Sequence, residues 1–156
     1  MNMLKAIAAA AVLMNPAAAM AGNVVAKTGE SVADFFKDEG AKVEVTTDSV
    51  GDPNLKVEYY GNDFSVYYYG CSDNTDCEAI QFFSGYQTDG SVRLSKINEW
   101  NTNNRFARAY VSEEGSARIE MDVLLGDDGM TPDDFADAVG LWNRAMQDFE
   151  EFIDWN

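Results

Sequence analysis

Four consecutive segments in the middle of the chain alternate apolar and polar residues, and this run constrains the fold more than any other feature. The apolar positions are Val43 and Val45; Leu55, Val57 and Tyr59; Phe64, Val66 and Tyr68; and Ile80, Phe82 and Tyr86. The turn-forming residues Gly51-Asp52-Pro53 and Gly61-Asn62 separate the first three segments, and a polar loop separates the last two. Strands joined by such short loops pair antiparallel, so the sequence predicts an antiparallel sheet.

The flanking segments have other periods. Residues 30–39 and 95–104 carry apolar side chains at helical spacing, and each ends in residues that stop a helix. Two further strands are expected over residues 105–111 and 117–125. In the second of these, Arg118, Glu120 and Asp122 alternate with apolar residues, so we expect their face to be solvated.

The last helix has the clearest start signal. Thr131 is suited to the N-cap, Pro132 to the first helical position, and the acidic pair that follows to the positive end of the helix dipole. The apolar stripe of this helix consists of Phe135, Val139, Trp142, Met146, Phe149 and Ile153. We therefore expect a long helix that lies across the sheet, in a single α+β domain of order αββββαββα, with an antiparallel sheet packed by helices.

Three more apolar residues of the last segment fall beside that stripe, namely Leu141, Phe152 and Trp155. They are interpreted either as a broad margin of the core or as a candidate interface with a second subunit or another protein.

The N-terminus has the composition of a signal peptide. Residues 1–21 combine one cation, an apolar stretch over residues 6–14 and small residues at the end. A membrane anchor is the alternative, but the apolar stretch is less than half of the roughly 20 residues that span a bilayer. We expect a periplasmic or secreted protein that is free of the membrane after cleavage, with a linker at residues 22–29 and a folded domain at residues 30–156.

Cys71 and Cys77 are the only cysteines and bracket the polar loop between two strands. In an oxidising compartment such a pair forms a disulfide, and the spacing is not that of a redox CxxC motif. A zinc site is the alternative, but two sulfurs without histidine supply only half of its ligands. We predict a disulfide that closes the hairpin.

Composition excludes several kinds of chemistry. The chain has no His, so Ser-His-Asp triads, Cys-His pairs and metal sites containing His cannot form within it. Its 11 Lys plus Arg against 27 Asp plus Glu give a net charge of −16, which argues against nucleic-acid binding. No phosphate-binding or nucleophile-elbow motif is present. We expect no enzymatic activity, no cofactor and no metal centre; weak cation binding by paired Asp residues in turns is the open alternative.

The most distinctive stretch is INEWNTNNRFARAY, from Ile97 to Tyr110. It combines a tryptophan with amides and cations, and its candidate binding residues are Trp100, Asn101, Arg105 and Arg108. In a structural interpretation, the Trp anchors the helix, Asn101 satisfies backbone groups and the arginines pair with acids. In a functional one, the arginines and amides bind an anion or a peptide terminus.

This stretch, followed by EMDV and by a helix that opens with TPDDF, resembles the YbjN domain family of bacterial proteins. The upstream YYYGC, with its second Cys, and FFSGY resemble the exported branch of that family, and the resemblance covers residues 30–153. It implies a fold similar to that of type III secretion chaperones, which often dimerise and bind protein segments. The family is also described as a sensory transduction regulator.

The function expected from the sequence is therefore that of a non-enzymatic, periplasmic, protein-binding module, either chaperone-like or regulatory. Its partner is expected to be another protein, and a homodimer is considered as well. The alternative is a small-ligand or ion-sensing module that uses Trp100, Asn101, Arg105 and Arg108.

Overall fold

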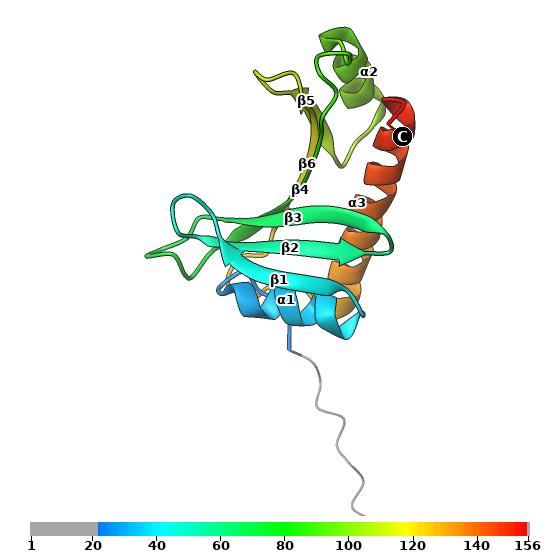
Figure 1. The fold of residues 1–156 in the computed structure, drawn as a ribbon. Helices are drawn as coiled ribbons and strands as arrows, with labels where there is room; N and C mark the ends of the chain where they lie inside the picture. The colour runs from blue at the N-terminus through cyan, green and yellow to red at the C-terminus, as the bar shows by residue number, and fades with distance from the viewer. Residues whose placement is uncertain (1–21, 156) are drawn as a thin grey trace, which may run out of the picture.

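Within residues 22–155, six strands form one antiparallel sheet, and three helices accompany it (Figure 1). The computed structural model describes residues 22–155; the expected signal peptide lies outside the described residues. The elements are α1 (Gly29–Asp38), β1 (Lys42–Thr47), β2 (Pro53–Tyr59), β3 (Asn62–Tyr69), β4 (Ala79–Tyr86), α2 (Leu94–Asn103), β5 (Arg108–Val111), β6 (Ala117–Leu124) and α3 (Pro132–Phe152). The predicted α+β class and the order αββββαββα are confirmed.

The strand order in the sheet is β1-β2-β3-β4-β6-β5. The first four strands pair with their neighbours in the sequence, as short hairpins require. β4 then pairs with β6 along its whole length, from Ala79 opposite Leu124 to Tyr86 opposite Ala117. The chain between them, which holds α2 and β5, loops out, so β5 lies at one edge of the sheet and β1 at the other.

Helices α1 and α3 pack on the same side of the sheet around a cluster of aromatic rings. The Phe82 ring of β4 stacks on Trp142 of α3, with their centroids 5.8 Å apart. The Phe36 ring of α1 lies edge-to-face with Phe82 at 6.3 Å and with Phe135 of α3 at 6.2 Å. All four residues are fully buried, so this layer of rings is the centre of the core.

The start and the stripe of α3 agree with the prediction. The Thr131 hydroxyl accepts a hydrogen bond from the backbone N–H of Asp134 at 3.2 Å, which is an N-cap. All six residues of the predicted stripe are buried: Phe135, Val139, Trp142, Met146, Phe149 and Ile153.

Three parts of the chain differ from expectation. β5 begins at Arg108 and not at Arg105, because the preceding residues connect α2 to the sheet and the Ala107 carbonyl accepts a hydrogen bond from the Trp100 indole. Glu120, expected on a solvated face, is only 7% exposed. Residues 22–29, expected to be a linker, carry Val24 and Ala26 into the core.

Candidate functional site

Trp100 is held in the core at the junction of α2 and β5. It is 2% exposed, and its indole N–H donates to the Ala107 carbonyl at 3.1 Å. Its ring lies 5.0 Å from that of Phe149 and 5.6 Å from that of Phe152, both on α3. The one polar group of this side chain is therefore bonded within the chain.

Asn101 closes the edge of the sheet at β5. Its side-chain N–H donates to the Ala109 carbonyl at 3.0 Å, and its side-chain oxygen accepts from the Ala109 N–H at 2.8 Å. These are the two bonds that a neighbouring strand would make with Ala109, so the amide stands in for a strand at this edge. The structural role considered for Asn101 matches this geometry.

The Arg108 side chain on β5 reaches acidic side chains of the neighbouring strand β6. Its guanidinium lies 2.7 Å from a Glu120 carboxylate oxygen and 3.8 Å from one of Asp122. Burial raises the pKa of Glu120 above its usual value; Arg108 partly offsets this, and Asp122 adds to it. Sequence reasoning missed Glu120, because strict alternation along β6 placed it on a solvated face.

Arg105 has no hydrogen bond or ion pair to any of residues 22–155. It lines a surface hollow of about 320 Å³ beside Phe106, Arg108 and Asp122. The four candidate binding residues thus lie in one region, but Trp100 and Asn101 are bonded to backbone and Arg108 to carboxylates. Arg105 alone of the four has no hydrogen-bond or ion-pair partner within residues 22–155.

Cys71 and Cys77 form the predicted disulfide, with an S–S distance of 2.10 Å. Their loop also holds two other segments. The Thr75 hydroxyl and the Asp76 N–H both donate to the Lys27 carbonyl, at 3.1 and 2.8 Å. The side chain of Asn74 donates to the β1–β2 turn, at the Val50 carbonyl and the Asp52 carboxylate. The disulfide therefore stabilises a loop that joins three parts of the chain.

The side of the sheet opposite α1 and α3, here called the open face, carries aromatic and aliphatic side chains. Its apolar members are Tyr67, Tyr69, Phe83, Tyr110 and Leu124. The Tyr67 and Phe83 rings meet edge-to-face at 5.6 Å, and the Arg118 guanidinium lies 5.9 Å from the Phe83 and Tyr110 rings. Tyr67, Phe83 and Tyr110 thus gather around the Arg118 cation, whereas Tyr69 and Leu124 lie farther along their strands, beyond Gln81 and Asp122; the five apolar residues are called the apolar row below.

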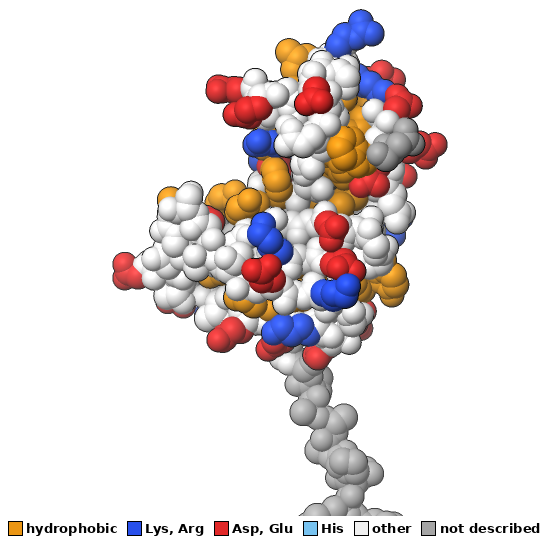
Figure 2. Space-filling view, in the orientation of Figure 1, with side chains coloured by type: hydrophobic (Ala, Val, Ile, Leu, Met, Phe, Trp, Pro, Cys, Tyr) orange, Lys and Arg blue, Asp and Glu red, His pale blue; other side chains and the backbone are white. Residues whose placement is uncertain are grey.

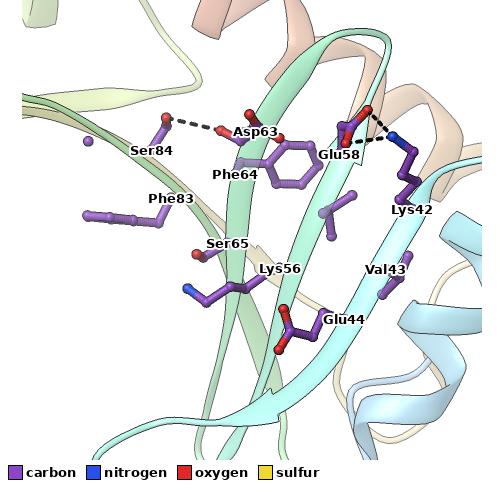
Figure 3. A pocket seen from close by; sticks show the side chains of 12 residues that line it. Lys42, Val43, Glu44, Lys56, Glu58, Asp63, Phe64, Ser65, Phe83 and Ser84 are labelled. Atoms are coloured by element: carbon purple, nitrogen blue, oxygen red, sulfur yellow. Dashed lines mark hydrogen bonds and ion pairs between the residues drawn. The ribbon is translucent and has the colours of Figure 1, made fainter.

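A groove of about 550 Å³ borders this row across β1, β2, β3 and β4 (Figure 3). Lys42 of β1 and Glu58 of β2 form an ion pair at 2.8 Å at one end of it. The Lys56 side chain extends toward Ser65 and the Phe83 side of the groove. The groove thus has both charges at its rim and an aromatic wall.

The three candidate interface residues of the last segment lie in different surroundings. Leu141 and Phe152 are half-buried against the core, and the Lys96 ammonium lies 5.2 Å from the Phe152 ring. Trp155 is 41% exposed, although its ring contacts that of Tyr86 at 5.3 Å. Figure 2 shows hydrophobic side chains gathered between α2 and the C-terminal end of α3.

Within residues 22–155, no group of three or more His, Cys, Asp or Glu is arranged to hold a metal ion. Across the same residues, no helix has the length and apolar character needed to cross a bilayer.

Comparison with known proteins places the chain in a family. The family model "YbjN: Putative bacterial sensory transduction regulator" matches residues 28–155. The chain is similar in fold to the crystal structure of YbjN from E. coli, described as "a putative transcription regulator", with a TM-score of 0.57 and 11% identity over 84% of this chain and 92% of that one. No protein of curated function matches the chain. The match over residues 28–155 confirms the resemblance drawn from the sequence, and the chain belongs to the YbjN family.

Proposed function

We propose that the protein is an exported, non-enzymatic regulatory module that binds another polypeptide on its open face. The observation that carries the proposal is the apolar row of that face, which lies opposite both α1 and α3. Tyr69 and Leu124 are 49% and 74% exposed and lie on either side of Ala79 across three neighbouring strands. Exposed apolar side chains that cluster in this way are typical of protein-binding surfaces.

The three candidate interface residues of the last segment, Leu141, Phe152 and Trp155, are a weaker candidate for the same role. Leu141 and Phe152 already pack within the chain, which leaves Trp155 as its exposed member. The small-ligand alternative is also weaker, because the polar groups of Trp100 and Asn101 are bonded to backbone atoms. The proposed partner is therefore a protein, either a different polypeptide or a second copy of this chain.

Affinity capture from the exported protein fraction tests the proposal. The bait variants are the Tyr69→Ser/Leu124→Ser double variant and a matched control, Tyr60→Ser/Leu94→Ser, which removes a Tyr and a Leu that are 78% and 73% exposed elsewhere. We expect the same polypeptide to be captured by the wild type and the control and lost with the open-face variant. Capture that is equal for all three baits, or no capture by any, contradicts the proposal.

Export is tested separately. Intact mass measurement of the protein from an osmotic-shock fraction should give a chain that begins at Gly22, after the small residues of the signal sequence. A chain that retains residues 1–21 and stays in the spheroplast fraction contradicts export without touching the binding proposal.

A further inference from the structure

Most cations of this acidic chain are paired with a carboxylate. Within residues 22–155, those with neither an ion pair nor a side-chain hydrogen bond are Lys56, Arg93, Arg105 and Arg144. Two of them, Arg105 and Arg144, line the same hollow of about 140 Å³. The sequence has 27 Asp plus Glu against 11 Lys plus Arg, so two neighbouring arginines without a carboxylate partner are unusual and leave donors for an anion.

The Arg144 side chain is turned away from Asp148, the next carboxylate along α3 that lines this hollow. A Cβ added at Gly140 would lie 3.5 Å from the Arg144 Nη1, so the guanidinium lies one turn toward the start of α3. Asp148 lies one turn in the other direction. Two turns separate Gly140 from Asp148, which is about 12 Å along the helix axis. The helix side of the hollow therefore has a cation at one end and a carboxylate at the other.

The remaining walls of the hollow are mainly apolar. Phe106 is 58% exposed, and Leu141 and Ala145 of α3 are half-buried against the core. The buried residues Trp100 and Ala107 complete the lining. A volume of about 140 Å³ is below the roughly 300 Å³ at which sites for drug-sized ligands begin. The hollow therefore suits a small group, such as one apolar side chain with its carboxylate.

This hollow continues into the larger one of about 320 Å³ described above, because residues 104–107 line both. The larger hollow adds the carboxylates of Glu120 and Asp122, which are hydrogen-bond acceptors. An extended chain that ends in the smaller hollow can thus pass over residues 104–107 and donate backbone N–H groups in the larger one. This continuity favours a polypeptide over a free small acid as the source of the carboxylate.

We propose that the hollow between residues 104–107 and α3 binds the C-terminus of a polypeptide whose last residue is apolar. The guanidinium groups of Arg105 and Arg144 hold the terminal carboxylate, since their paired N–H donors match its two oxygens. The last side chain lies against Phe106, and Asp148 accepts the N–H of the last residue. The inference adds to the protein-binding function proposed above, but it uses a surface other than the open face and can fail without it.

Titration of the isotope-labelled protein, followed by NMR shifts of backbone amides, tests the ligand. The probe is an acetylated Gly-Ser-Gly-Leu peptide with a free carboxylate, compared with the same peptide amidated at its C-terminus and with N-acetyl-leucine. We expect saturable shifts at Arg105 and Phe106 with the free peptide, weaker binding of N-acetyl-leucine and no binding of the amide. Equal binding of the acid and the amide, or no saturable shift with any probe, overturns the proposal. N-acetyl-leucine that binds as tightly as the peptide overturns the assignment to a polypeptide.

Arginine variants test the site. Arg105→Gln and Arg144→Gln should each weaken peptide binding about tenfold or more through the loss of charge-assisted hydrogen bonds, with unchanged unfolding midpoints. The matched control is Arg93→Gln, which removes an unpaired arginine that lines a different hollow and should bind like the wild type. Equal affinities of the three variants, whether weakened or not, overturn the proposal. Tyr69→Ser/Leu124→Ser should bind the peptide normally, so loss of the captured partner with retention of peptide binding contradicts only the open-face function.

Discussion

Replacing Asn101 with Ala separates the two interpretations of the Trp-Asn pair. The substitution removes the hydrogen bonds of 3.0 and 2.8 Å to Ala109, which is 5% exposed. At about 1 kcal/mol each, the loss is about 2 kcal/mol, offset by up to about 0.7 kcal/mol of better helix propensity. The free energy of unfolding should therefore fall by about 1.5 kcal/mol without any ligand present.

The matched control is Asn98→Ala, at an exposed position of the same helix whose side chain makes no hydrogen bond within the described residues. Asn98→Ala should gain the better helix propensity of Ala without losing a hydrogen bond. The free energies of unfolding of the two variants, measured in urea, should therefore differ by about 2 kcal/mol. Amide exchange gives a local readout, because the Ala109 N–H is bonded only to Asn101 and should exchange faster in Asn101→Ala. Equal stability of the two variants, with unchanged exchange at Ala109, would refute the structural role of the amide.

Three further predictions concern stability. The Cys71→Ser/Cys77→Ser variant should lose about 2 kcal/mol in urea unfolding from the chain entropy of the opened loop, and an unchanged midpoint would contradict this. Thr131→Ala should lose about 1 kcal/mol with its N-cap, whereas Thr131→Ser should retain it; equal losses would count against capping. Burial raises the pKa of Glu120 in the folded state, so its contribution to stability should fall as pH rises from its unfolded to its folded pKa. Glu120→Gln should lack that slope in unfolding measured across acidic pH, and identical pH profiles would contradict the assignment.

Much of the secondary structure could be predicted because its signals are local. The N-cap of Thr131 and the stripe of α3 depend on residues three or four positions apart, and each hairpin depends on a turn between adjacent alternating segments. The start of β5 was misplaced because INEWNTNNRFARAY contains no residue that marks where the helix connection ends. The Ala107 carbonyl accepts a hydrogen bond from the buried Trp100 indole, and this bond fixes the conformation of the connection between α2 and β5.

The candidate site was located by sequence but not resolved by it. The sequence singled out the stretch around Trp100, Asn101, Arg105 and Arg108, and the last three line one hollow in the structure. Whether the Asn101 amide and the Arg108 guanidinium are free or bonded depends on how close Asn101 lies to Ala109 and Arg108 lies to Glu120 and Asp122 of β6. Glu120 was missed for the same reason, since its burial comes from strands β4 and β5 on either side and not from its own neighbours in the sequence.

By itself, the sequence determined the αββββαββα order, the cystine hairpin and the family, because each of these follows from residues close together in the chain. Only the tertiary structure decided that β4 pairs with β6, that Asn101 closes one edge of the sheet and that β1 is left open at the other. The β4–β6 pairing joins segments that α2 and β5 separate in the sequence, and the two edges of the sheet lie at its opposite ends. Such pairings depend on which strand edges compete for the same backbone partners, and no local pattern of residues encodes that competition.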